Sequence, residues 1–297
     1  MQIRGVDGTR GTNFRQMPDR IAVVTGASSG IGLLTSLELA RAGFHVVATM
    51  RDLGRRSRLE AAAASEGVGE KLEVRELDIT HTEAIGPLIS QIARAYGRID
   101  LLVNNAGFAM SGFAEDIDLR ELRRQLDTNF FGHVAMTQAV LPLMRSQQAG
   151  HIIMVSSISG RLGQAVISSY SASKFALEGW AESLRLETHS LGIRVVLVEP
   201  GAFKTDIWDR NVVLAERALR PDSPNRERAA KFRDFVQKNV PKADARQVAR
   251  LITRIAQDPN PKLRYIIGRD ARVQLWLRRL LPWKRYERLI ARAIGIG

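Results

Sequence analysis

The stretch that decides the fold is "VTGASSGIG", residues 24–32, which follows a short apolar run and opens a longer helix-period segment. Its glycines, Gly26, Gly30 and Gly32, have the spacing G-x-x-x-G-x-G. Glycine permits a tight turn and lets backbone N–H groups approach a pyrophosphate, which the positive end of a following helix also attracts. The turn therefore predicts a dinucleotide site, with Thr25, Gly26, Ser28, Ser29, Gly30, Ile31 and Gly32 as its cofactor-binding residues.

Apolar runs alternate with helix-period segments along the rest of the chain. Seven strands are expected, at residues 20–26, 44–50, 72–78, 99–107, 150–157, 193–201 and 263–268, and helices near 30–42, 54–66, 81–96, 118–145 and 168–191. Strands that are apolar on both faces require helices on both sides of a parallel sheet. We therefore expect an α/β fold, a doubly wound parallel sheet of Rossmann type in a single domain, which holds ligands at the carboxyl ends of its strands.

The composition of the chain varies around this core. We expect residues 1–18 to form a polar, Gly-rich tail, which lacks the apolar region of a signal peptide. We expect residues 19–268 to form the dinucleotide-binding and catalytic domain. Within it, about 206–240 is polar and Arg-rich and follows a strand end, where a substrate loop is expected. Residues 269–297 form a basic amphipathic helical extension.

Bulk composition excludes several kinds of function. The 297 residues contain no cysteine, which excludes disulfides and thiol chemistry, and the five histidines lack metal-ligand spacing, so no metal site is expected. No apolar run reaches the ~18 residues of a membrane span. The net charge of +13 is concentrated after residue 261 and no nucleic-acid motif accompanies it. We expect a cytoplasmic protein that does not bind nucleic acid.

A second informative stretch is "SSYSASKFALEGW", residues 168–180. Tyr170 and Lys174 stand four residues apart, so on a helix they lie one above the other on the same face. An ammonium beside a phenol favours the phenolate and lowers its pKa from the ordinary value near 10. The pair predicts a proton-transfer site, whereas two surface residues sharing a face by chance are the alternative.

The end of the second expected strand, "ATMRD", bears on the choice of dinucleotide. An acid at this point binds the ribose 2′-hydroxyl of NAD, whereas an arginine accommodates the 2′-phosphate of NADP. Arg51 comes first and Asp52 follows it. We predict NADP, bound by Arg51 with Ser28, and keep NAD as the alternative because Asp52 could contact a ribose.

Three further motifs complete a pattern. "NNAG" (104–107) follows the fourth strand, "VSS" (155–157) ends the fifth and "EPG" (199–201) ends the sixth. In this order and spacing, with the glycine turn and the Tyr170–Lys174 pair, the chain resembles the short-chain dehydrogenase/reductase family. The resemblance is dense from Arg20 to Thr205 and implies an NAD(P)-dependent oxidoreductase acting on CH–OH groups.

The resemblance also implies roles for individual residues. Tyr170 would be the general acid or base, Lys174 would lower its pKa and hold the nicotinamide ribose, and Ser157 would bind the substrate oxygen. Asn129, in "LDTNFFG", matches the family asparagine that holds a water of the proton relay, or else is a capping or core-satisfied amide. Ser156 faces the other way on a strand and is interpreted as structural.

Other positions match residues that line the cofactor in the family. The residues at its adenosine end would be Asp78, Ile79, Asn104, Ala106 and Gly107, and those framing the nicotinamide carboxamide would be Pro200, Gly201, Phe203 and Thr205.

A softer resemblance concerns substrate and partners. "HVVATMRDL", "LVNNAGF" and "RYIIGRDARVQLWLRRLLPW" are similar to hydroxysteroid and retinol dehydrogenase-like members, which implies an apolar, steroid-, retinoid- or lipid-like alcohol or carbonyl. Residues that could form its walls are Phe108, Met110, Phe113, Val166 and Trp208. The family forms homodimers or homotetramers through the helices near 118–145 and 168–191.

The basic ending "LPWKRYERLIARAIGIG", residues 281–297, allows more than one interpretation. Its apolar residues recur at near-helical spacing between basic ones, as in helices that lie peripherally on an anionic membrane. The alternatives are a helix that closes the substrate cleft and a subunit contact. Two functions of other classes also remain, a non-catalytic dinucleotide-binding sensor and a membrane-surface protein.

Overall fold

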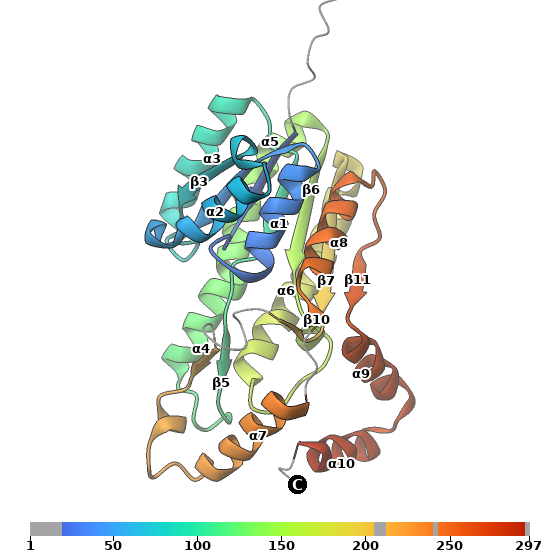
Figure 1. Cartoon of the computed structure of the whole chain (residues 1–297). Helices are drawn as coiled ribbons and strands as arrows, with labels where there is room; N and C mark the ends of the chain where they lie inside the picture. The colour runs from blue at the N-terminus through green and yellow to red at the C-terminus, as the bar shows by residue number, and fades with distance from the viewer. Residues whose placement is uncertain (1–19, 205–211, 240–242, 295–297) are drawn as a thin grey trace, which may run out of the picture.

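A parallel seven-stranded sheet forms the centre of the molecule in the computed structural model, which describes residues 20–204, 212–239 and 243–294. Its order is β11-β7-β6-β4-β1-β2-β3. Figure 1 labels β11, β7, β6 and β3 of this sheet. The strands are β1 (Arg20–Val24), β2 (Phe44–Met50), β3 (Leu72–Glu76), β4 (Leu101–Asn104), β6 (Gly150–Val155), β7 (Ile193–Pro200) and β11 (Arg264–Ile267). β1 pairs in parallel with β2 on one side and with β4 on the other. The strand order therefore switches between β1 and β4, since the chain adds β2 and β3 on one side of β1 and the later strands on the other. The predicted fold is confirmed.

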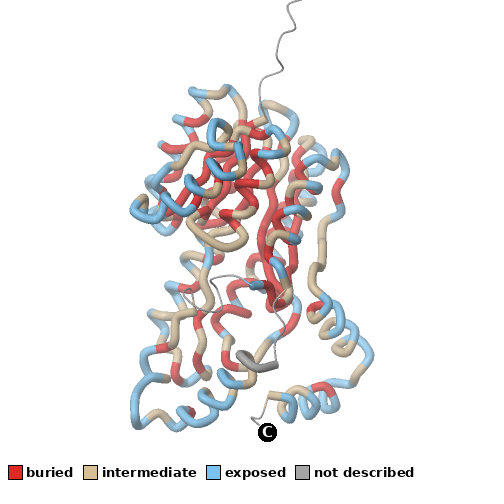
Figure 2. The backbone as a smooth tube through the Cα atoms, viewed as in Figure 1, coloured by how far each residue is buried: buried red, intermediate tan, exposed pale blue. Residues whose placement is uncertain are grey.

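Helices cover both faces of this sheet because its strands are apolar on both sides. On β1, Ala22 and Val24 pack into one core with α1 (Gly30–Arg41), α2 (Ser57–Ser65) and α8 (Arg246–Gln257). Ile21 and Val23 pack into the other, with α3 (Thr82–Tyr96), α5 (Gly132–Gln147) and α6 (Ser168–Thr188). The central strands are accordingly the most continuously buried part of the chain (Figure 2).

Several helices differ from their predicted extents. The single helix expected at 118–145 is three pieces: α4 (Leu119–Leu126), a π-helical turn (Asp127–Phe131) and α5. The segment expected at 168–191 ends as α6 at Thr188 and continues as a 3₁₀ turn, and α2 starts at Ser57 after another 3₁₀ turn. The C-terminal extension is two helices, α9 (Arg269–Leu280) and α10 (Trp283–Ala293), because Pro282 lacks the N–H that a continuous helix needs.

The segment predicted as a substrate loop contains regular structure. It includes β9 (Val212–Leu214), which pairs with β5 (Ala109–Ser111), and α7 (Arg226–Asn239). A second small pair joins β8 (Phe203–Lys204) to β10 (Ala243–Asp244). Neither pair was predicted, because strands of two or three residues leave no periodic signal.

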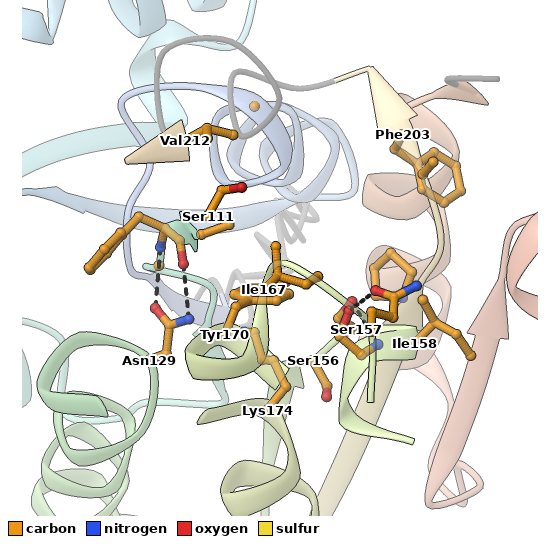
Figure 3. Close-up of a pocket in the computed structure, with 18 of the residues that line it drawn as sticks. Ser111, Asn129, Ser156, Ser157, Ile158, Ile167, Tyr170, Lys174, Phe203 and Val212 are labelled. Atoms are coloured by element: carbon orange, nitrogen blue, oxygen red, sulfur yellow. Dashed lines mark hydrogen bonds between the residues drawn. The ribbon is translucent and has the colours of Figure 1, made fainter. Parts of the chain in front are cut away.

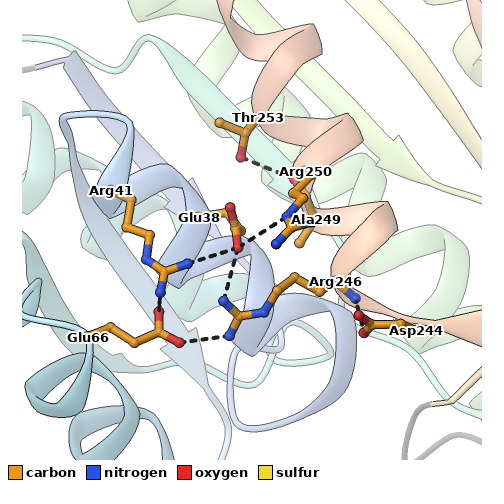
Figure 4. A network of polar contacts seen from close by, with 8 residues as sticks. All are labelled: Glu38, Arg41, Glu66, Asp244, Arg246, Ala249, Arg250 and Thr253. Atoms are coloured by element: carbon orange, nitrogen blue, oxygen red, sulfur yellow. Dashed lines mark hydrogen bonds and ion pairs between the residues drawn. The ribbon is translucent and has the colours of Figure 1, made fainter.

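An ionic network holds α8 against α1 and the end of α2 (Figure 4). Glu38 Oε1 lies 3.2 Å from Arg41 Nη1 and 3.2 Å from Arg246 Nη1. Glu66 pairs with the same two arginines, at 3.0 Å from Arg41 and 2.7 Å from Arg246. Since α1 begins at the glycine turn, these contacts also fix the helix behind the predicted cofactor site.

Candidate active site

A pocket of about 1040 Å³ lies at the carboxyl ends of the central strands. Such a position at a topological switch point is where doubly wound sheets bind ligands. The predicted residues that line it are Gly26, Ser28, Ser29, Gly30, Ile31, Arg51, Asp78, Ile79, Ala106, Gly107, Asn129, Ser157, Tyr170, Lys174, Pro200, Gly201 and Phe203. Thr205 lies outside the described residues, and Thr25, Gly32 and Asn104 lie behind the lining.

The glycine turn is shaped by close backbone approaches. Gly26 has φ +69°, which disfavours a side chain, and a Cβ there would lie 2.7 Å from Ala106 Cα. A Cβ on Gly32 would lie 2.4 Å from Gly26 O. The N-cap Ser29 makes no side-chain cap hydrogen bond to the first turn of α1. The cradle therefore leaves the first-turn N–H groups of α1 for an anionic ligand, which fits a pyrophosphate.

Thr25 supports this cradle from behind. Its buried hydroxyl accepts hydrogen bonds from the backbone N–H groups of Asn105 at 2.9 Å and Ala106 at 3.0 Å. The Asn105 side-chain amide donates to the carbonyl oxygen of Thr25 at 2.9 Å. These contacts join the end of β4 to the turn after β1, so Thr25 acts on the cofactor site through the backbone.

The prediction that Asn104 contacts the ribose is corrected by the structure. Its side chain is buried and Nδ2 donates to Thr137 Oγ1 of α5 at 2.9 Å, whereas Asn105 lines the pocket. Alternation along β4 is the physical reason, since Leu102 already faces the core with α5 and residue 104 lies on the same side. Counting that alternation in the sequence would have selected Asn105.

The adenosine end of the pocket is bordered by two arginines. Arg51 and Arg55 line it, whereas Asp52 turns its carboxylate to its own loop and accepts a hydrogen bond from Gly54 N at 2.9 Å. Arg55 was missed by sequence reasoning, although its place four residues after Arg51 puts it on the same short turn. The border of the pocket is thus basic where a 2′-phosphate would lie.

Asp78 borders the same end from the loop after β3. Its Oδ1 accepts hydrogen bonds from Thr80 N at 2.9 Å and from Thr80 Oγ1 at 2.8 Å. Partial burial acts to raise the pKa of Asp78, but the Thr80 bonds and the positive charges of His81 and Arg51 outweigh it and hold that pKa below its usual value. Asp78 therefore carries its negative charge at neutral pH.

Tyr170, Lys174 and Ser157 come together deeper in the pocket (Figure 3). Tyr170 and Lys174 project from one face of α6, with Lys174 Nζ 5.7 Å from the centre of the Tyr170 ring. Lys174 Nζ donates a hydrogen bond to the carbonyl oxygen of Val155, the last residue of β6, at 2.8 Å. Ser157 follows two residues later, and its hydroxyl acts to lower the pKa of Tyr170. The arrangement offers a proton donor, a cation and a hydroxyl at one point.

Burial changes the proton affinities of these groups. It raises the pKa of Tyr170 above its ordinary value of 10.0, and among the described residues the Ser157 hydroxyl opposes that effect. It lowers the pKa of Lys174 to about 8, opposed by the charge of Glu178. The predicted lowering of the tyrosine pKa by Lys174 is therefore absent in the chain alone, and Tyr170 holds its proton there.

Asn129 occupies the π-helical turn between α4 and α5. Its side-chain amide pairs with the backbone of Phe108, donating to Phe108 O at 3.0 Å and accepting from Phe108 N at 3.2 Å, and it also donates to Ser173 Oγ at 3.2 Å. These bonds fit the core-satisfied amide that the sequence left as an alternative, and the residue also lines the pocket, so its role in holding a relay water stays a prediction. Ser156, predicted to be structural, lines the pocket as well.

The outer walls come from segments distant in the sequence. The pocket lining includes Phe232 and Val236 of α7 and Tyr286 and Ile290 of α10. The C-terminal extension therefore borders the cleft, and its closure of the cleft stays a prediction. Among the predicted apolar walls, Phe108 and Val166 line it, Met110 and Phe113 do not, and Trp208 lies outside the described residues.

The family model of the short chain dehydrogenase matches residues 20–212. The chain belongs to the short-chain dehydrogenase family. It is an oxidoreductase that acts on CH–OH groups.

Three similar proteins within this family have the following identity and coverage. The chain is 40% identical over 280 residues to the uncharacterized oxidoreductase YusZ of Bacillus subtilis, covering 94% of this chain and 99% of the relative. It is 43% identical over 190 residues to human retinol dehydrogenase 8, covering 63% of this chain and 60% of that protein. A metagenomic short-chain oxidoreductase solved in complex with NADP has a TM-score of 0.64 and 28% identity, covering 84% of this chain and 96% of that one.

Among the described residues, neither a metal centre nor a membrane-spanning helix accompanies this pocket. In the described part of the chain, acidic, histidine and cysteine side chains nowhere gather in a group that could hold a metal ion. No described helix is long and apolar enough to cross a membrane.

Proposed function

We propose that this protein interconverts an apolar alcohol and its ketone or aldehyde with NADP(H). The observation that carries the proposal is the meeting of Tyr170, Lys174 and Ser157 in a pocket whose other end has a glycine cradle and two arginines. The nicotinamide cofactor would supply or accept the hydride. The residues that would hold it are those of the glycine cradle, with Arg51, Asp78, Asn105 and Lys174.

The protein's own groups would handle the proton. In reduction, the Tyr170 hydroxyl donates its proton to the developing alkoxide while Ser157 hydrogen-bonds the same oxygen. A phenol that holds its proton at neutral pH suits this direction. In oxidation Tyr170 must lose that proton first, and the Lys174 ammonium and the positive oxidised nicotinamide would stabilise its phenolate.

NADP is proposed over NAD because of the charges at the adenosine end. Arg51 and Arg55 line the pocket and Asp52 turns away from it, so the cofactor phosphate meets two cations there. A guanidinium binds phosphate oxygens through its planar fork of donors. The NADP complex of the metagenomic relative agrees with this assignment.

An apolar substrate is proposed from the outer walls. Leu214 of β9, Phe232 of α7 and Ile290 of α10 line the pocket beyond the catalytic cluster. Apolar walls favour a hydrocarbon body over a charged one. The likeness to retinol dehydrogenase 8 supports a steroid-, retinoid- or lipid-like molecule.

Two partners are proposed beyond the substrate. Subunit contacts through the long helices of the α4–α5 and α6 segments would give a homodimer or homotetramer, which sedimentation velocity would detect. The exposed side chains of Trp276, Leu280 and Trp283, which lie among basic residues of α9 and α10, would contact an anionic membrane surface.

Replacing Tyr170 with Phe tests the catalytic assignment. We expect kcat to fall by roughly 10²–10⁴-fold, because the proton donor is lost. Tyr286→Phe is the matched control, since it removes a phenol hydroxyl from the same pocket without touching the proton-transfer site. Turnover of a panel of apolar ketones and alcohols is followed by nicotinamide absorbance. Equal rates for parent and Tyr170→Phe would overturn the assignment.

A further inference from the structure

A buried acidic group lies directly behind the proton-transfer site. Glu178 is four residues after Lys174 on α6, and both residues are only 4% exposed. Together with Tyr170 they form one face of the helix, at positions i, i+4 and i+8. Below that face Gly160 lies so close that a Cβ on it would be 2.8 Å from Glu178 Cγ. The carboxylate is therefore enclosed between α6 and the turn that follows β6.

The carboxylate of Glu178 shares its partner with a second buried acid. Arg264 Nε of β11 lies 3.2 Å from Glu178 Oε2 and 3.2 Å from Glu199 Oε1, and Glu199 is fully buried at the end of β7. One N–H therefore serves two carboxylates, which must lie close together. Arg161, from the turn after β6, adds a second guanidinium 3.3 Å from Glu199 Oε1.

Burial raises the proton affinity of both acids in this pair. Burial and then the charge of Glu178 raise the pKa of Glu199 to about 7. Burial also raises the pKa of Glu178, but the Ser156 hydroxyl, Arg264 and Arg161 oppose that effect. Two guanidiniums, Arg264 and Arg161, face the two carboxylates and balance their charge, and Glu178 lies one helical turn from Lys174.

Lys174 needs a nearby anion because its surroundings disfavour charge. Its ammonium donates to the Val155 carbonyl oxygen, which is a neutral partner. The other titratable group facing it from α5 is His133, which is fully buried and whose pKa burial lowers to about 3, so it is neutral. Tyr170 also holds its proton in the chain alone. Glu178 is thus the anion available to Lys174 among the described residues.

We propose that Glu178 is a positioning residue that keeps the buried Lys174 ammonium charged, and through it supports the phenolate of Tyr170. The inference rests on the proposed function, in which Lys174 serves the tyrosine as a cation. It adds a residue that itself touches neither substrate nor cofactor.

The test compares Glu178→Gln with Glu182→Gln. Glu182 lies one turn further along α6 and pairs with the same guanidinium, Arg264 Nη2, at 3.1 Å, but its side chain is 56% exposed. Both variants remove one acid from Arg264, and only the first removes the anion beside Lys174. Melting curves establish that each variant is folded, and Glu178→Asp, which keeps the charge, provides the conservative rescue.

The primary measurement is the titration of Lys174 itself. The protein carries 13Cε-labelled lysine, and the Lys174 resonance is assigned by its loss in Lys174→Met. We expect the Lys174 midpoint to fall by about 1 pH unit or more in Glu178→Gln, to stay at the parent value in Glu182→Gln, and to recover in Glu178→Asp. Equal midpoints in the parent and Glu178→Gln would overturn the inference.

The pH profile of kcat/KM for alcohol oxidation is the second measurement. Its alkaline limb, where Lys174 loses its proton, should move to lower pH by the same amount in Glu178→Gln and remain in place in Glu182→Gln. A purely structural role would lower activity at every pH and leave the limb where it was. If the Lys174 midpoint shifts in Glu178→Gln but the parent turns over no alcohol, the inference is supported and the proposed function is refuted. The two failures are therefore distinguishable.

Discussion

At the scale of single residues, the proposed preference for NADP rests first on Arg51, which directly follows β2. Arg51→Ala should lower the preference for NADPH over NADH by roughly 10–100-fold, because it removes a charge-assisted contact with the 2′-phosphate. Arg55→Ala should act in the same direction, and the double variant more strongly. The measurement is kcat/KM for both cofactors with one substrate.

Arg56→Ala is the matched control for this prediction. Arg56 is adjacent to Arg55, pairs with Glu60 at 3.6 Å and is absent from the pocket lining. Arg56→Ala changes the net charge by the same amount as Arg51→Ala but leaves the pocket lining unchanged. Preferences that fell equally in Arg51→Ala and Arg56→Ala would indicate a general charge effect and remove the argument for NADP.

At the scale of elements, α9 presents an apolar stripe to solvent. Val273, Trp276 and Leu280 follow the helical spacing i, i+3, i+7 and are 48%, 62% and 57% exposed. Replacing Trp276 and Leu280 together with Ala should reduce binding to vesicles of anionic lipid by about tenfold or more, because each buried apolar side chain contributes about 1.5–3 kcal/mol. Co-sedimentation with vesicles measures the bound fraction.

The controls for this element use an exposed leucine on another helix and the charge of the lipid. Leu186→Ala on α6 removes a side chain that is 78% exposed and lies outside the C-terminal helices. It should leave vesicle binding unchanged, and vesicles of neutral lipid should bind the parent weakly. If the parent does not bind anionic vesicles, membrane contact is refuted, and the stripe would instead contact a protein partner or a second copy of the chain.

At the scale of the whole molecule, a buried histidine couples folding to pH. Burial, followed by the charge of Lys174, lowers the pKa of His133 from 6.5 to about 3. Between these two pKa values the unfolded chain binds one more proton than the folded chain. The free energy of unfolding therefore falls as pH falls through this range, by up to about 1.4 kcal/mol per pH unit. Glu199 acts in the opposite sense between 4.5 and about 7, where the folded state holds the extra proton.

His133→Gln should separate the two effects. His133 Nε2 contacts the Ala106 carbonyl oxygen at 2.7 Å, a contact that a glutamine amide can replace. Below pH 4.5, where Glu199 no longer compensates, the free energy of unfolding of this variant should decline less steeply than that of the parent. Urea unfolding at a series of pH values gives both slopes, and parallel slopes would refute the coupling.

Much of this molecule could be predicted because its signals are local. The seven strands, the glycine turn after β1 and the Tyr170–Lys174 pair each depend on the residue types and spacing within one short stretch. The π-helical turn at Asn129 was missed, since nothing in the alternation of apolar residues distinguishes one long helix from two joined by such a turn. Confusing Asn104 with Asn105 was an error of side-chain direction on a strand.

The sequence by itself determined the doubly wound sheet and the residues that meet at its switch point, because strand periodicity and a glycine turn act over a few neighbouring positions. Only the tertiary structure decided which distant segments share the pocket and the buried charges. Tyr286 of α10 lines the pocket. Arg264 of β11 contacts both Glu178 of α6 and Glu199 of β7, so three separate elements meet there. Such contacts depend on how elements pack across the fold, and the energy of a buried charge is set by neighbours that sequence distance does not reveal.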